Sequence, residues 1–277
     1  SGRHLVALKY STMITDSHCH LASGNFSSDL DQVIERAVAG KVSRMVTIST
    51  DLEDSSKCIE IAKHNDCVWA TAGIHPCSVT EIQNENWIRE IREMAEKESV
   101  AAIGEIGLDY FHPAPSGWTE ESYRNLQGEF LHSQLELAAE LGLNAIIHHR
   151  DRGNECWEEL LNIIAPFNGK VRVVFHCFSS SWETAKPLIE QGHLISFTGI
   201  ATFKNATDIQ QCAATCPINS FMIETDSPYL APVPFRGKRC EPMHAMTTAK
   251  FIADLRKIPM EILSEKTNKT ADLFFRF

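Results

Sequence analysis

Histidines and acidic residues follow several short apolar segments of this chain, and these residue types are the best suited to chemistry. Imidazole and carboxylate groups are the usual protein ligands of divalent metals such as Zn²⁺ and Mn²⁺. If the fold brings these side chains together, the pattern predicts a metal centre. The six candidate ligands are His18, His20, Glu105, His148, His176 and Asp226.

His18 and His20 are the closest pair within this set. Alternate side chains of an extended strand face the same side, so both imidazoles point one way and Cys19 points the other. Two imidazoles on one side suit the chelation of a single cation. We therefore expect the pair to hold one metal.

The two acidic candidates have a second explanation. Glu105 and Asp226 each follow an apolar segment, where an ionised carboxylate needs a counter-charge or a metal to offset its desolvation. A salt bridge to Arg150 or Arg239 would serve equally well. The carboxylates alone do not decide between the two.

The elements that would position these residues form a regular alternation of short, β-branched apolar segments and longer helical patterns. Such alternation is typical of parallel strands with crossover helices. Eight units in about 250 residues predict an α/β fold, a single-domain (β/α)8 TIM-like barrel. The strands are expected at 13–16, 44–48, 68–72, 100–106, 144–148, 171–175, 193–197 and 221–223, and the helices at 29–39, 55–64, 85–97, 122–141, 156–164, 182–191, 208–214, 244–255 and 260–274.

Such a barrel would bring the candidate ligands to one place. Active sites of TIM barrels lie at the carboxyl ends of the strands. We expect His18 and His20 on one cation, His148 and His176 on a second, Glu105 between them, and Asp226 beside the open position. The imidazole content favours Zn²⁺, Mn²⁺ or Co²⁺, although availability in the cell can favour Mg²⁺.

Glycines and the chain start complete the expected organisation. Gly40, Gly142 and Gly192 each follow a helical pattern and precede a strand, where a left-handed helix cap is expected. Residues 1–12 are expected to form an N-terminal extension, and residues 13–277 the barrel domain.

Composition limits the partners and the cellular setting. Of 277 residues, 43% are hydrophobic and 22% charged, as in ordinary globular proteins. The net charge of −10 excludes a long-range positive field, so a polyanionic substrate must be bound by local contacts. The apolar runs are too short to span a membrane. Nine cysteines, an odd number without a C-x-x-C motif, favour a reducing compartment, the cytoplasm or the nucleus.

Around the candidate ligands, the sequence resembles the TatD family of metal-dependent deoxyribonucleases, within the amidohydrolase-like barrels. The resemblance runs from about Asp16 to the C-terminus. Its motifs are DSHCHL (16–21), AGIHP (72–76), AIGEIGLDY (102–110), IIHHRD (146–151), VFHCFSS (174–180), IETDSPYLAP (223–232) and RCEP (239–242).

The resemblance implies a TIM barrel, one or two divalent metals (Mg, Mn or Zn) and hydrolysis of DNA phosphodiesters, commonly from the 3′ end. Its metal positions fall on the six candidate ligands, and its surrounding motifs contain His75, Asp109, Arg150 and Glu224. Members typically have R-N-E-P where Cys240 replaces the Asn here, which leaves the role of that side chain open. His149 adjoins the fifth-strand ligand, but strand alternation favours His148.

The leading hypothesis is metal-assisted hydrolysis of DNA, in which Asp226 and Glu105 are catalytic and Asp226 orients or deprotonates the attacking water. His75, Arg150 and Arg239 are expected to contact substrate. The segment 235–239 (FRGKR), with Phe178, Lys204 and Tyr229, could contact a single strand.

Two other functions stay open on the sequence. A metal centre in a barrel can also hydrolyse an amide or a carbonyl ester, including an aminoacyl-tRNA ester. Glu105 weighs against this, because many amidohydrolase barrels carry a carbamylated lysine at the bridging position. The third possibility is a binding scaffold without turnover, and the intact set of candidate ligands weighs against it. The oligomeric state is not predicted.

Overall fold

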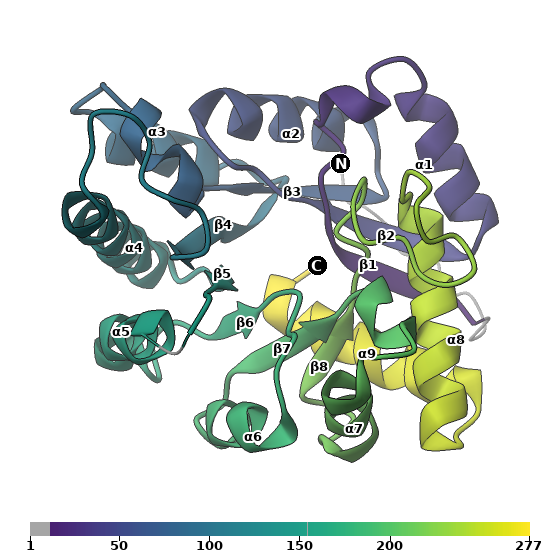
Figure 1. Ribbon diagram of the computed structural model, residues 1–277. Coiled ribbons are helices and arrows are strands. Elements are labelled where there is room, and N and C mark those ends of the chain that lie inside the picture. The colour runs from purple at the N-terminus through teal and green to yellow at the C-terminus, as the bar shows by residue number, and fades with distance from the viewer. Residues whose placement is uncertain (1–11, 154) are drawn as a thin grey trace.

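The computed structural model describes residues 12–153 and 155–277, and its eight strands form a single parallel sheet in the order β1 to β8 (Figure 1). A bridge between Cys19 and Ser227 joins β1 to the segment after β8, so the sheet curves into a nearly closed barrel. The (β/α)8 prediction is confirmed. The strands are β1 Ile14–Cys19, β2 Val42–Thr47, β3 Val68–Ala72, β4 Val100–Asp109, β5 Ala145–Arg150, β6 Val173–Phe175, β7 Leu194–Phe197 and β8 Phe221–Ile223.

Helices surround the strands, and each of the nine predicted helical segments has a counterpart in the described residues (Figure 1). The α-helices are α1 Leu30–Ala39, α2 Leu52–His64, α3 Trp87–Ala95, α4 Glu120–Leu141, α5 Glu155–Ile164, α6 Trp182–Glu190, α7 Thr207–Thr215, α8 Ala245–Arg256 and α9 Met260–Phe275. Short 3-10 helices lie at η1 Gly24–Phe26, η2 Pro76–Glu81, η3 Ala165–Phe167, η4 Gly199–Thr202 and η5 Pro242–His244.

The prediction of a left-handed glycine is wrong at one of its three positions, Gly40. Gly142 and Gly192 have φ of +66° and +92°, but Gly40 has φ of −77°, and Lys41 takes the left-handed position instead. A Cβ at Gly40 would lie 3.2 Å from the Cβ of Met243. Gly40 therefore serves the close approach of α1 to η5 and not a left-handed turn.

The last helix covers the amino-terminal end of the barrel. Phe274 and Phe275 of α9 pack in one cluster with Val46, Ile146 and Met222 from three different strands. Residues of strands on different sides of a barrel can meet only in its interior. The side-chain amide of Asn144, just before β5, donates to the carbonyl of Phe274 over 2.6 Å, which places α9 at the end where the strands begin.

The predicted N-terminal extension (1–12) lies outside the described residues except for Thr12. Within the described residues, no helix combines the length and apolar character that crossing a bilayer requires. All nine cysteines are described, and all are free thiols.

Candidate metal centre

A cavity of about 770 Å³ opens at the carboxyl ends of the strands, opposite α9. Five of the six predicted ligands line it, and the sixth, His18, is fully buried beside them. The barrel thus brings together side chains that are as much as 208 positions apart in the chain, His18 and Asp226. The five lining residues are His20, Glu105, His148, His176 and Asp226.

The end of β1 and the segment after β8 form the first group of donor atoms. The Nε2 atoms of His18 and His20 lie 3.3 Å apart, and they are 3.6 and 3.3 Å from Oδ1 of Asp226. Two contacts fix this arrangement. The backbone N–H of Asp226 donates to the carbonyl of His18 over 2.9 Å, and Nδ1 of His20 lies 3.2 Å from the carbonyl oxygen of Ile48.

Glu105 of β4 stands between this group and a second one. Its Oε2 lies 3.5 Å from Nε2 of His18 and 3.9 Å from Nε2 of His20. Its Oε1 lies 2.7 Å from Nε2 of His176 and 2.8 Å from Nδ1 of His148. One carboxylate therefore presents an oxygen to each pair of histidines.

These separations suit metal ligation. Ligand atoms around a tetrahedral divalent ion at about 2.0–2.2 Å lie about 3.3–3.6 Å from one another. The donor separations in the structure, 2.7 to 3.9 Å, bracket that range. Two donor sets, His18–His20–Glu105 and His75–Glu105–His148, each have their atoms within 4.8 Å of one another. The residues present fit divalent cations.

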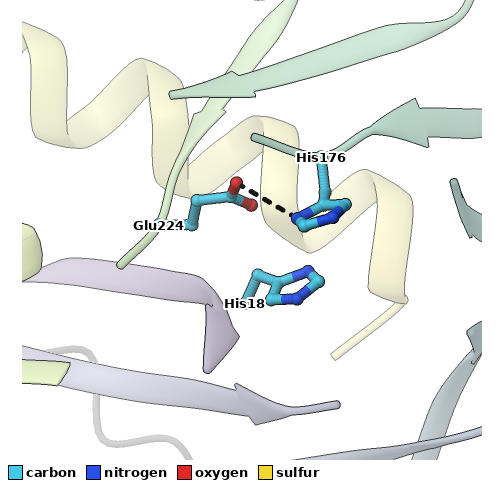
Figure 2. A group of neighbouring side chains, drawn as sticks. All are labelled: His18, His176 and Glu224. Carbon is cyan, nitrogen blue, oxygen red and sulfur yellow. Dashed lines mark ion pairs between the residues drawn. The ribbon is translucent and has the colours of Figure 1, made fainter. Parts of the chain in front are cut away.

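A carboxylate lies beside each histidine of the second group, Asp109 beside His148 and Glu224 beside His176. Oδ2 of Asp109 lies 3.0 Å from Nε2 of His148. Glu224 lies beside His176, with Oε1 3.7 Å from its Nδ1, and Figure 2 shows the contact together with the neighbouring His18 ring. The rings of His18 and His176 stack with centroids 4.0 Å apart. Carboxylates in such positions orient histidine ligands.

Glu224 is itself held in place. Its Oε1 accepts the backbone N–H of Cys177 and its Oε2 accepts the hydroxyl of Ser196, each over 2.6 Å. The Nδ1 atoms of His18 and His176 are buried and have no hydrogen-bond partner in the described part of the chain. The three side chains in Figure 2 also form a possible cation-binding group.

Neighbouring histidines favour the ionised form of Glu105 and Asp226. Burial opposes ionisation of Glu105, but His176, His75 and His148 outweigh it and hold its pKa well below the usual value. Burial likewise opposes ionisation of Asp226, and the hydrogen bond and charge of His20 with the charge of His18 lower its pKa nonetheless. Both carboxylates are therefore ionised at neutral pH, as ligation requires.

His75, like His18, has a pKa that burial lowers. Burial, reinforced by the nearby His148, lowers its pKa to about 3, so the ring is neutral at neutral pH. Its Nδ1 accepts the backbone N–H of Cys77 over 3.0 Å, which assigns the ring proton to Nε2. That Nε2 lies 3.7 Å from Oε1 of Glu105. His75 therefore offers an N–H group beside the donor atoms.

The arginines do not pair with the two carboxylates. Arg150 lines the cavity with its guanidinium 4.1 Å from the centroid of the Phe111 ring. Arg239 donates to Asp29 over 2.7 Å and to Glu241 over 2.8 Å, and it is not among the residues lining the cavity. The structure thus brings Arg150 to the site but not Arg239.

The structure also places four further residues that the sequence analysis named. His149 also lines the cavity, but its ring packs against Trp157 with centroids 4.4 Å apart. Cys240 is fully buried, and its backbone N–H donates to the carbonyl of Pro228 over 3.0 Å. Phe178, expected to contact substrate, is buried in the core, whereas Tyr229 is 57% exposed at the cavity.

Sequence reasoning missed His112 and Asp54, which also line the cavity. His112 lies in the loop after β4, where its Nδ1 is 2.9 Å from Oδ2 of Asp109. Asp54 lies in the first turn of α2, where its side chain accepts the backbone N–H of Thr50 over 3.0 Å. An acidic residue in a first helical turn is ordinary, so the sequence held no signal for Asp54.

Comparison with known proteins agrees with this geometry. Residues 15–276 match the profile of the TatD related DNase family. YabD of Bacillus subtilis (strain 168), an uncharacterized metal-dependent hydrolase, is 35% identical over 265 residues, which cover 95% of this chain and 99% of YabD. YcfH of Escherichia coli (strain K12), also an uncharacterized metal-dependent hydrolase, is 34% identical over 258 residues, covering 92% of each chain.

A solved structure shows the same architecture. The TatD homologue YJJV from Escherichia coli K12 superposes with a TM-score of 0.84 at 25% identity, covering 97% of this chain and 100% of that one. Fold and site together define a TIM-barrel hydrolase of the metal-dependent class. The chain belongs to the TatD related DNase family.

Proposed function

We propose that this protein is a divalent-metal-dependent deoxyribonuclease that removes nucleotides from the 3′ ends of single-stranded DNA. The observation that carries the proposal is Glu105, whose two oxygens face two separate pairs of histidines at an open cavity. Membership of the TatD related DNase family supports nucleic acid as the substrate.

In this proposal the six side chains at the cavity hold two divalent ions, Mg²⁺, Mn²⁺ or Zn²⁺. His18, His20 and Asp226 form one site, His148 and His176 the other, and Glu105 contributes an oxygen to each. Bound there, the ions would activate a water molecule and stabilise negative charge on the scissile phosphate.

Asp226 and His75 have distinct proposed roles around the phosphate. Asp226 is ionised and partly exposed to the cavity, so its free oxygen can orient the attacking water and accept its proton. His75 is neutral with its proton on Nε2, so it can donate a hydrogen bond to a phosphate or leaving-group oxygen. Asp226 has to accept a proton, and His75 has to donate a hydrogen bond. The lowered pKa of each group keeps Asp226 ionised and His75 neutral at neutral pH.

Substrate contacts are proposed for residues on the wall of the cavity. Arg150 can bind a phosphate oxygen with the guanidinium that lies over Phe111. The exposed ring of Tyr229 can stack on a base of a single strand. Arg239 has no part in the proposal, because Asp29 and Glu241 already occupy its donors. Nine free thiols favour a reducing setting, the cytoplasm or the nucleus.

The test is to incubate metal-reconstituted protein with 5′-labelled and 3′-labelled single-stranded DNA. We expect stepwise shortening of the 5′-labelled strand, early release of the 3′ label, and loss of both in the presence of a chelator. Asp226→Asn should lower the rate by about 10²- to 10⁴-fold, because the water loses its proton acceptor.

Glu53→Gln is the matched control. Glu53 lies in the same first turn of α2 as Asp54, but its side chain is exposed, pairs with Lys57 and does not line the cavity, so this variant should keep the activity. Hydrolysis of an aminoacyl ester without cleavage of DNA would replace the proposal with a carbonyl esterase. Metal binding without turnover of either substrate would indicate a binding scaffold.

A further inference from the structure

A second cluster of metal-binding side chains lies at the edge of the cavity, outside the six candidate ligands. It consists of Cys77 in η2, Asp109 at the end of β4 and His112 in the following loop. One donor atom from each lies within 4.8 Å of the other two. The geometry points to a third cation site, of the zinc type, formed by the Cys77 thiolate, the Asp109 carboxylate and the His112 imidazole.

The distances between the donor atoms of this cluster are close to those of a zinc site. Sγ of Cys77 lies 3.8 Å from Nδ1 of His112, and that Nδ1 lies 2.9 Å from Oδ2 of Asp109. Around a tetrahedral Zn²⁺, with Zn–S about 2.3 Å and Zn–N about 2.0 Å, ligand atoms lie about 3.3–3.6 Å apart. Shifts of a few tenths of an ångström would bring these two distances into that range.

The backbone holds the three side chains in position. Oδ1 of Asp109 accepts the backbone N–H groups of Phe111 and His112 over 3.0 and 2.9 Å, which folds the loop back onto the strand end. The hydroxyl of Tyr123 in α4 donates to the carbonyl of Pro76, next to Cys77. The cluster is thus built on anchored segments from two βα units.

The donor chemistry selects the class of cation. A thiolate with an imidazole and a single carboxylate favours Zn²⁺ or Co²⁺ over the hard ions Mg²⁺ and Ca²⁺. Three protein ligands leave a fourth position, as in zinc sites that bind water or substrate. Asp109 and His112 line the cavity, so that position can be reached from it.

Binding of the cation requires a balanced loss of protons. Burial and the charge of Asp109 raise the pKa of the Cys77 thiol to about 12, so the thiol is protonated until a cation displaces its proton to solvent. Nδ1 of His112 also has to release its contact with Asp109 to coordinate, and the ring proton then resides on the exposed Nε2. Each cation bound therefore releases one proton from Cys77.

The experiment is a titration of metal-free protein with Co²⁺, followed by its near-ultraviolet thiolate-to-cobalt charge-transfer absorption. This signal needs a cysteine ligand, so the six candidate ligands of the proposed two-metal centre do not contribute to it. We expect the band in the native protein and its loss in Cys77→Ser. His112→Asn should weaken the Co²⁺ affinity measured by the band by more than about tenfold.

Two cysteine variants serve as controls. Cys67 is partly buried before β3, at the far end of the barrel, so Cys67→Ser should keep the band. Cys156 belongs to another possible group with His149 and Asp151, and Cys156→Ser should also keep it. Circular dichroism shows whether each variant is folded. His112→Asn changes a half-exposed side chain, so it keeps the test valid if Cys77→Ser does not fold.

Absence of the band in native protein, or its survival in Cys77→Ser, would overturn the inference. Loss of the band in Cys156→Ser alone would move the thiolate ligand to the other group. The nuclease assay is independent, because it depends on Asp226 and Glu105 and not on Cys77. Failure of the third site and failure of the proposed function are therefore distinguishable.

Discussion

At the scale of single residues, the site depends on carboxylates that position histidines. Asp109 holds His148 by a 3.0 Å contact, and Glu224 lies 3.7 Å from His176 while accepting hydrogen bonds from Ser196 and Cys177. Each carboxylate lies beside a histidine whose ring faces Oε1 of Glu105. Such groups contribute to metal affinity through the orientation of the ligand.

Replacing Glu224 with Gln tests this positioning role. Gln keeps the volume but removes the charge beside Nδ1 of His176, so we expect metal affinity to fall about 10- to 100-fold. Competition with a chelating dye measures it. Glu183→Gln, in the first turn of α6, is the control and should bind metal as the native protein does. Native affinity in Glu224→Gln would show that Glu224 does not position His176.

At the scale of elements, the close pairing of β4 with β5 brings Glu105 to His148. Gly107 pairs with His148 across the two strands. It has φ of +145°, and a Cβ built on it would lie 2.0 Å from the carbonyl oxygen of His148. Only glycine fits this position, so the backbone approach and the placement of the His148 ring depend on it.

Gly107→Ala should lower the free energy of unfolding by more than about 2 kcal/mol, because the strands must separate to admit the methyl group. Urea unfolding measures the change. Gly128→Ala in α4 is the matched control: its Cβ would meet atoms only at 3.5 Å and beyond. That variant should gain about 0.5–1 kcal/mol from helix propensity. Equal effects of the two substitutions would contradict the explanation.

At the scale of the whole molecule, charged side chains join the segment after β8 to the start of α1. Arg239 and Arg36 both contact Asp29 and Glu241. Hydrogen bonds from Arg239 and Arg36 lower the pKa of Asp29 to about 2. The same two arginines hold the pKa of Glu241 below its usual value against the effect of burial.

Arg239→Gln should therefore reduce stability in a pH-dependent way. A carboxyl whose pKa is lowered on folding stabilises the protein above its unfolded pKa of about 4 and loses that contribution as the pH falls through about 2. The difference from native protein should be full at neutral pH and shrink between about pH 4 and about pH 2. Urea unfolding across this range measures it, with Arg89→Gln, in an exposed pair with Glu93, as the control.

Local sequence patterns predicted the fold and the set of candidate ligands. Eight apolar segments and nine helical patterns predicted the barrel, because strand and helix periodicities reflect which side chains must be buried. The candidate ligands could also be chosen from the sequence. The carboxyl ends of all strands of a barrel lie together, so recognising the strands shows which side chains share that end. The alternation that separated His148 from His149 is equally local.

Contacts between distant residues were decided only by the tertiary structure. Arg239 was expected at the substrate, but it pairs with Asp29 some two hundred residues earlier, and Gly40 meets Met243 instead of forming a left-handed cap. Cys77, Asp109 and His112 come from two different βα units. Which side chains meet across such separations depends on strand register and loop path, and no local periodicity encodes either.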